Sequence, residues 1–380
     1  MNQVTLGDYK PTETWKVASE IMDALKTRIS YSSRSARFEN DFAAIHGCPY
    51  GIISNSGTSA LLVAIQALKE LRGWKDNEYI AIPALTFVAT ANAILHAGMI
   101  PFPVDIDPET LQLDMENMSI MPYNTRAILP VHLFGNMPDM DALMAFAGEN
   151  GLAVIEDCCE AFGASHNGKM AGSFGDVGCF STYVAHHIVT GVGGMCTTRS
   201  EELANLMRSL VNHGISDDGL PIGERYDTGH LGRKFEFVRI GHSFRVTEIE
   251  AILGLDQISN WDWRIERRRS HAALLATTLM ATSKLGVMKI RPGVRCSYMV
   301  FPVIANEMTN LEAIAILNKH NIEGRMAMPL TNQPCYPWMF EEIYPQSAWV
   351  NRHGFYVGCH EHLTVEQVEH AAKIICQEIR

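Results

Sequence analysis

Short apolar runs recur along the first half of the chain and predict a series of strands. They occupy residues 79–84, 100–106, 126–132, 151–157 and 178–183. Segments with apolar residues at helical spacing separate most of these runs, such as those at 89–96 and 140–150. Strands that alternate with helices are typical of βαβ units, so we expect an α/β fold with a parallel sheet.

The pattern changes after about residue 255. A long helix is predicted over 258–280, a strand over 297–304, and a closing helix over 363–379, where Thr364 and Gln367 have capping-box spacing. We therefore expect two domains, a large one over residues 1–255 and a small α+β domain over 256–380. The glycine-rich, charged stretch at 216–234 predicts a long surface loop.

Composition narrows the function classes. The 380 residues are 47% hydrophobic and 19% charged, which is enough apolar material for one large or two moderate cores. The net charge of −11 argues against a general nucleic-acid or membrane-surface binder, which usually carries a basic face. No secretion signal opens the chain and no apolar run reaches ~18 residues, so we expect a cytoplasmic protein. The nine cysteines form no CxxC pair, which predicts free thiols and no metal site.

Polar residues stand where the predicted strands end. Asp157 closes one strand, and a loop that holds the adjacent His186 and His187 follows another. Ligands of open α/β sheets bind at the carboxyl ends of the strands. The Ser-Gly-Thr-Ser turn at 56–59 precedes a predicted helix over 59–71, so its N–H groups suit a phosphate or serve as an ordinary helix cap.

Several motifs occur together in one order along the chain. They are "SGTS" (56–59), "PALTFVATANAI" (83–94), "PVHLFGNMPDM" (130–140), "IEDCCEAFGA" (155–164), "STYVAHHIVTGVGG" (181–194), "GHSFRVTEIEAILGLDQI" (241–258) and "LTVEQV" (363–368). In these motifs the chain resembles the DegT/DnrJ/EryC1/StrS sugar aminotransferases, which are fold-type I pyridoxal-phosphate enzymes. The resemblance covers nearly the whole chain. It implies a large α/β/α domain with a mostly parallel, mixed seven-stranded sheet and a small C-terminal α+β domain.

The resemblance assigns cofactor roles to matching residues. Asp157 would keep the pyridine ring nitrogen protonated, as an electron sink requires, and the ring of Phe87 would stack on the pyridine. The phosphate ligands would be Gly57, Thr58, Ser59 and Ser181. In relatives an asparagine from the neighbouring subunit also reaches the phosphate, and Ser243 stands at that position here. The resemblance therefore implies a homodimer with shared active sites.

One position departs from the aminotransferase pattern in a decisive way. The family lysine that binds the cofactor covalently is replaced by His186. An imidazole has no primary amine, so we expect non-covalent pyridoxamine or pyridoxal phosphate, with His186 as an acid–base catalyst. This substitution resembles a histidine-bearing branch of the family, the GDP-4-keto-6-deoxymannose 3-dehydratases, in which the sugar loses its C3 hydroxyl and glutamate reloads the amine. A second such branch, the CDP-hexulose 3-dehydratases, holds an iron–sulfur cluster, and the cysteine spacing here favours the cluster-free type.

Other departures surround the same centre. Val192 replaces the glutamate of a "GEGG" motif, and Glu160 replaces a glutamine or histidine in a cofactor-binding position. His242 and Ser243 stand in "GHSFR" where the family has "GYNYR". We expect Glu160 or His242 to position a substrate hydroxyl, or else each to be a local polar replacement. His187 is a further substrate-side candidate.

A nucleotide diphosphate needs cationic partners, and guanidinium forks suit its oxygens. The candidates are Arg34, Arg37, Arg233, Lys234 and Arg325, each of which a solvated surface position would also explain.

Three other interpretations stay open. The protein could be an aminotransferase or epimerase that uses another amine, such as Lys234. It could also be a lysine-less homologue that binds a cofactor or sugar without catalysis, or His186 could be an engineered replacement.

Overall fold

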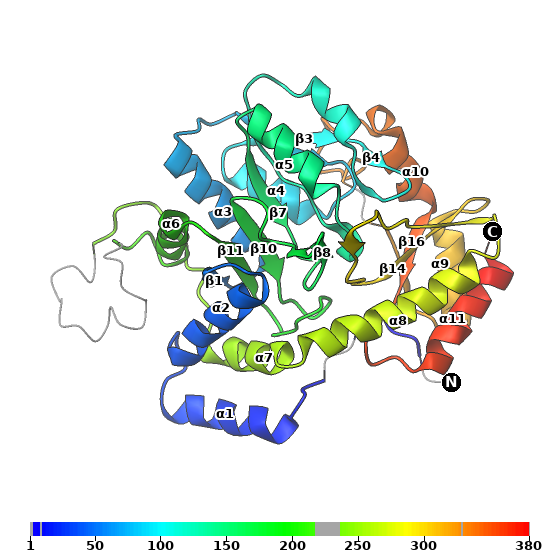
Figure 1. The fold of residues 1–380 in the computed structure, drawn as a ribbon, viewed down its shortest axis with the longest axis horizontal. Coiled ribbons are helices and arrows are strands. Elements are labelled where there is room, and N and C mark those ends of the chain that lie inside the picture. The colour runs from blue at the N-terminus through cyan, green and yellow to red at the C-terminus, as the bar shows by residue number, and fades with distance from the viewer. Residues whose placement is uncertain (1–2, 8–9, 217–235, 328–329, 380) are drawn as a thin grey trace.

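The structure is a computed structural model that describes residues 3–7, 10–216, 236–327 and 330–379. A seven-stranded sheet forms the centre of the larger part of the molecule (Figure 1). Its order is β1-β11-β10-β7-β6-β2-β3. The strands are β1 (Tyr50–Ser54), β2 (Tyr79–Pro83), β3 (Ile100–Val104), β6 (Thr125–Ile128), β7 (Ala153–Asp157), β10 (Val177–Ser181) and β11 (Gly194–Thr198). The predicted α/β class and the mixed seven-stranded sheet are confirmed.

Strand direction decides where a site can form. Strands β3, β2, β6, β7 and β10 run parallel, whereas β11 is antiparallel to both β10 and β1. The parallel strands therefore end at one edge of the sheet. Cys179 of β10 lies beside Asp157 of β7 in register, so the loops that follow these two strands leave the sheet together.

Two layers of helices cover the sheet, because its strands are apolar on both faces. Ile52 and Ile53, neighbours on β1, pack into different core clusters on opposite faces. One layer comprises α3 (Gly57–Arg72), α4 (Val88–His96) and α6 (Glu201–Val211). The other comprises α2 (Ser33–Ile45), α5 (Met140–Glu149) and α7 (Glu248–Ile258), with α1 (Thr14–Lys26) packed on α7.

A second, four-stranded sheet forms the smaller part, in the order β12-β14-β16-β15. Its elements are α8 (Trp261–Leu279), β12 (Leu285–Val287), β14 (Phe301–Ala305), α9 (Asn310–Lys319), β15 (Gly324–Met326), α10 (Pro345–His353), β16 (Gly354–Val357) and α11 (Val365–Glu378). Both bonds of the predicted Thr364–Gln367 capping box are present. The helix expected over 258–280 is α8, which begins at Trp261 because the chain leaves helical geometry at Asn260, its N-cap.

Short elements make up the remaining regular structure of the described residues. They are β4 (Ile106–Asp107), β5 (Gln112–Leu113), β8 (Ser165–His166), β9 (Lys169–Met170), β13 (Val294–Arg295) and the 3-10 turns Met115–Ile120, Leu133–Gly135 and Glu341–Ile343. Within the described ranges, no helix combines the length and the apolar character that crossing a bilayer requires.

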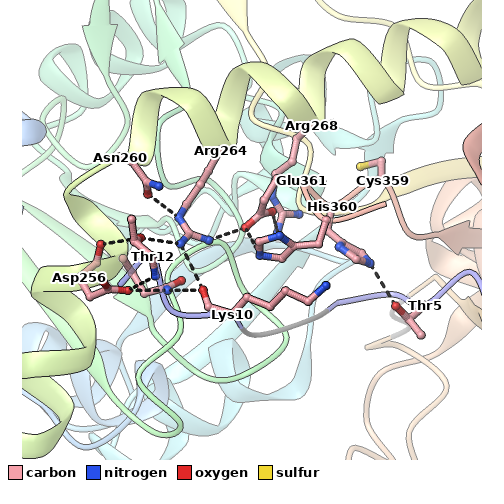
Figure 2. A network of polar contacts seen from close by, with 12 residues as sticks. Thr5, Lys10, Thr12, Asp256, Asn260, Arg264, Arg268, Cys359, His360 and Glu361 are labelled. Atoms are coloured by element: carbon pink, nitrogen blue, oxygen red, sulfur yellow. Dashed lines mark hydrogen bonds and ion pairs between the residues drawn. The ribbon is translucent and has the colours of Figure 1, made fainter. Parts of the chain in front are cut away.

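A buried ionic network ties α8 to the segment after β16 (Figure 2). The carboxylate of Glu361 meets the guanidinium groups of Arg264 at 2.7 Å and Arg268 at 2.9 Å. Arg268 also donates a hydrogen bond to the carbonyl oxygen of Met299 at 2.9 Å. The network therefore holds the 299 segment against α8, and that segment reaches the cavity described next.

Candidate active site

A cavity of about 360 Å³ opens at the carboxyl ends of β7 and β10. Its walls come from the turn before α3, the start of α4, the ends of three strands, the loop after β10 and the small sheet. The predicted site residues that line it are Gly57, Thr58, Phe87, Asp157, Glu160, Ser181, His186 and Arg325. Segments far apart in sequence are thus brought to one place.

The turn before α3 is built to approach an anion closely. Ser56 caps the helix by accepting a hydrogen bond from the Ser59 N–H at 3.1 Å. A Cβ on Gly57 would lie 2.8 Å from Cβ of Ser181 and 2.9 Å from Sγ of Cys159, so only glycine lets the helix start against β10. The N–H groups of the first helical turn and the Thr58 hydroxyl suit a phosphate. The Ser59 hydroxyl, by contrast, donates to Asn55 Oδ1 at 2.7 Å, and Ser59 does not line the cavity.

Asp157 presents a buried carboxylate to the cavity. Its Oδ2 accepts from the Thr90 hydroxyl at 2.8 Å and its Oδ1 from the Cys159 N–H at 3.2 Å. Burial raises the pKa of Asp157. No cation among the described residues forms an ion pair with its carboxylate to offset this effect. A protonated ring nitrogen would supply the missing charge, so the residue fits a pyridine cofactor.

Phe87 lies at the other side of the same space. It is the N-cap of α4, and 57% of its surface is exposed although it is a large apolar residue. An aromatic ring left open on the wall of a cavity is suited to stack on a flat ligand.

His186 lies in a tight loop between β10 and β11. Its backbone N–H donates to the Tyr183 carbonyl oxygen at 2.9 Å, and its Nδ1 is buried without a hydrogen-bond partner. Burial is the main reason that the pKa of His186 is lowered to about 4, with the charge of Arg268 adding to it. The imidazole is therefore neutral near pH 7.

The loop keeps its shape through hydroxyl bonds and glycine. The hydroxyls of Thr182 and Thr190 lie 2.6 Å apart, and Thr190 also donates to the Val192 carbonyl oxygen at 2.8 Å. At Gly193, where φ is +155°, a Cβ would lie 2.3 Å from the Thr182 hydroxyl oxygen. The "VTGVGG" sequence thus fixes how the His186 side chain is presented.

His187 has a different environment from its neighbour. Its Nε2 donates to the Ser297 carbonyl oxygen at 3.2 Å, and burial lowers its pKa well below the ordinary value. It does not line the cavity. It joins the loop after β10 to the segment that precedes β14.

Glu160 lines the cavity three residues after Asp157. Its Oε2 accepts from the N–H of Phe134 at 2.7 Å, and Phe134 has a left-handed backbone with φ of +58°. Burial, followed by the charge of Asp157, raises the pKa of Glu160 to about 8.

Arg34, His242 and Ser243 also lie away from this cavity in the single chain. Arg34 pairs with Glu20 at 3.1 Å and with Asp23 at 2.5 Å. His242 Nε2 bonds Gln66 at 2.8 Å and its ring stacks on Phe244. Ser243 accepts from Arg245 at 2.8 Å.

The remaining basic candidates differ in position. Arg325 lines the cavity and pairs with Glu323 at 3.0 Å. Arg37 pairs with Asp41 at 3.2 Å on the surface. Arg233 and Lys234 lie outside the described residues.

Thr90 and Tyr356 are among the cavity residues that were absent from the predictions. Thr90 bonds Asp157, and a signal existed, since it follows Thr86 by one helical turn within a recognised motif. Tyr356 of β16 comes from the small sheet, and no local pattern marks it.

Known proteins show the same architecture. The chain matches the model of the DegT/DnrJ/EryC1/StrS aminotransferase family over residues 12–376 and belongs to that family. It is 36% identical over 232 residues to the GDP-perosamine synthase of Caulobacter vibrioides, covering 61% of this chain and 58% of that protein. It is 29% identical to the GDP-4-keto-6-deoxy-D-mannose 3-dehydratase of Yersinia pseudotuberculosis, covering 99% and 100%. The Escherichia coli structure of the latter enzyme, with bound hydrated PLP, has a TM-score of 0.90 at 24% identity and covers 98% and 99%.

Proposed function

We propose that the protein is a dehydratase that uses pyridoxamine phosphate to remove the C3 hydroxyl of a nucleotide-linked 4-keto-6-deoxy sugar. The observation that carries the proposal is His186, a neutral imidazole with an unpartnered Nδ1 on the wall of a cavity otherwise suited to the cofactor. The relative from Yersinia pseudotuberculosis, which the chain matches over nearly its full length, supports the same reaction.

The residues present fit the cofactor. Asp157 would hold the ring nitrogen, Phe87 would cover a ring face, and Gly57, Thr58 and Ser181 would hold the phosphate. When bound, the cofactor supplies an amine that condenses with a ketone and a ring that accepts electrons. No lysine of the described residues lines the cavity, so nothing described there would bind the aldehyde form covalently.

His186 would act as the proton carrier. A neutral imidazole in a buried wall can accept a proton near pH 7 and return it later. The tight loop holds its ring in place, and burial keeps it unprotonated until the reaction releases a proton to it. Because His186 cannot trap an aldehyde, the amine form of the cofactor stays available.

Substrate and assembly follow from the outer part of the site. We propose that Arg325 meets the diphosphate, since its guanidinium lies at the cavity wall and needs little rearrangement to leave the exposed Glu323 pair. We also propose a homodimer in which Ser243 completes the partner's phosphate site, because Ser243 does not reach the cavity of its own chain. Glutamate is the proposed amine donor, and the cytoplasm the proposed location.

A second function, amine transfer to the sugar, is supported by the 36% identity to a GDP-perosamine synthase. The experiment that separates the two starts with borohydride reduction of the protein loaded with pyridoxal phosphate. Wild type should show no covalent label, whereas His186→Lys, the matched control that restores an amine, should be labelled at residue 186. A label on any lysine of the wild type would contradict the proposed role of His186.

The second step supplies pyridoxamine phosphate with a panel of nucleotide-linked 4-keto-6-deoxy sugars. Ammonia release and a sugar product lighter by one oxygen atom support dehydration, and retention of nitrogen in the sugar supports amine transfer. We expect His186→Asn to bind the cofactor and lose turnover. Full activity in that variant would remove His186 from the mechanism.

A further inference from the structure

The two carboxyl oxygens of Glu160 differ in their hydrogen bonding. Its Oε2 is used by the N–H of Phe134 at 2.7 Å, whereas no hydrogen bond or ion pair from a described residue reaches Oε1. Glu160 is only 7% exposed, yet it belongs to the wall of the same cavity as His186. One oxygen is therefore anchored and the other is available to a ligand.

No cation among the described residues pairs with the carboxyl group of Glu160. The charged and titratable groups that share its cavity are Asp157, Cys159, Tyr183, His186, Arg325 and Tyr356. Asp157 is a second acid, and the Arg325 guanidinium pairs with Glu323 at 3.0 Å. The pKa of Cys159 is raised well above its ordinary value and that of Tyr356 to about 12, so neither brings a charge at neutral pH.

Burial and the neighbouring Asp157 raise the pKa of Glu160 to about 8, which agrees with this geometry. Two carboxyl groups in one low-dielectric space do not both ionise, and the ionised partner is the one that meets a cation. A ring nitrogen bound at Asp157 would make Asp157 the anion. Glu160 would then keep its proton at neutral pH.

We propose that Glu160 is the general acid of the reaction and gives its proton to the oxygen that leaves C3 of the sugar. The inference rests on the proposed dehydration. The C3–O bond breaks, the oxygen takes the pair of that bond and the Glu160 proton, and water departs. With pyridoxamine phosphate bound, His186 would accept a proton from the cofactor carbon that carries the amine, and the electron pair of that C–H bond would move toward C3, so one proton is given and one is taken. Solvent returns a proton to Glu160 after water has left.

A purely structural role is the competing explanation, because Glu160 also holds the left-handed turn at Phe134. Glu160→Gln separates the two roles. The glutamine carbonyl oxygen can still accept from the Phe134 N–H, but the side chain has no acidic proton to give. A structural role predicts nearly normal turnover in this variant, and the general-acid role predicts loss.

The first measurement needs no cofactor or substrate. Infrared difference spectra of wild type against Glu160→Gln should show a carboxylic-acid C=O band at neutral pH that disappears with a midpoint near pH 8. Absence of that band at neutral pH would overturn the inference, whether or not the protein is a dehydratase.

The second measurement uses the enzyme loaded with pyridoxamine phosphate. We expect kcat of wild type to fall as pH rises through about 8 and Glu160→Gln to lose this limb together with roughly 100-fold or more of kcat. The cofactor's absorption spectrum and KM should change little. Normal kcat in Glu160→Gln would overturn the inference. If the infrared band is present at neutral pH but wild type turns over no sugar, the proposed dehydration is refuted. The Glu160 proton would then have no leaving oxygen to go to.

Discussion

Replacing Glu361 with glutamine tests how the buried network on α8 stabilises the fold. Glu361 lies between two guanidinium groups, with side-chain exposures of 2% for Glu361, 3% for Arg264 and 5% for Arg268. Glutamine has nearly the same shape but no charge. The substitution would leave two buried cations without their shared anion, and Arg268 would hold Met299 less firmly.

The magnitude can be worked out in two ways. Removing one partner of a buried ion pair costs about 3–5 kcal/mol, because the remaining charge is desolvated without compensation. The second route starts from the pKa of Glu361, which burial raises but the two arginines and other groups lower more strongly, to about 2 from 4.5. That difference corresponds to about 3 kcal/mol of stability. The two routes agree to within their precision.

The pH dependence has a definite sign. The folded pKa of Glu361 is below the unfolded value, so the unfolded chain binds the proton more readily. The contribution is therefore complete above about pH 4.5 and is lost as the pH falls toward 2. In Glu361→Gln this part of the acid sensitivity should be absent.

The assay is urea unfolding at neutral pH, read by circular dichroism. Glu266→Gln is the matched control, because Glu266 also lies between two arginines, Arg269 at 2.6 Å and Arg295 at 2.7 Å, but is 57% exposed. We expect a loss of about 3–5 kcal/mol for Glu361→Gln and of less than about 1 kcal/mol for Glu266→Gln. Equal losses in the two variants would refute the reasoning that burial determines how much these ion pairs contribute to the free energy of unfolding.

Three further predictions concern single residues. Asp157→Asn should weaken pyridoxamine phosphate binding by about 10- to 100-fold, as a lost charge-assisted bond implies, and fluorescence titration would show no change if Asp157 were not a ligand. Gly57→Ala should destabilise the fold by about 1–3 kcal/mol through its contacts with Ser181 and Cys159; an unchanged melting temperature would contradict this. Burial lowers the pKa of His46 from 6.5 to about 4, so the free energy of unfolding should fall by on the order of 3 kcal/mol as the pH drops between those values. His46→Gln should make this dependence of stability on pH less steep. An unaltered pH dependence would exclude His46 as its source.

Features that depend on local order could be predicted from the sequence. The strand that ends at Asp157 and the turn at Gly57 are marked by apolar runs followed by small or polar residues. The parallel arrangement then brings the strand ends together, so the cavity follows from topology. The same reasoning placed His186 at the cavity without any contact being known.

Features that depend on long-range packing could not be predicted. Glu160 meets Phe134 only because a turn with positive φ directs that N–H toward it. Arg268 affects His186 from a helix more than 80 positions later, through burial that no local pattern reveals. His186 and His187 look alike in the sequence. The backbone of their loop directs the His186 side chain to the cavity wall and lets His187 form a hydrogen bond with the Ser297 carbonyl oxygen.

The N-terminal segment has a consequence for how the chain is made. Val4 is 1% exposed within the core of the small sheet and pairs with Ile322, and the Leu6 N–H reaches Glu323, 317 positions later. A ribosome that adds about 5–20 residues per second would need roughly 15–60 s between these two ends. During that time the segment around Val4 has no small sheet to pack on, so this part of the core closes only after the late strands of the small sheet have been translated.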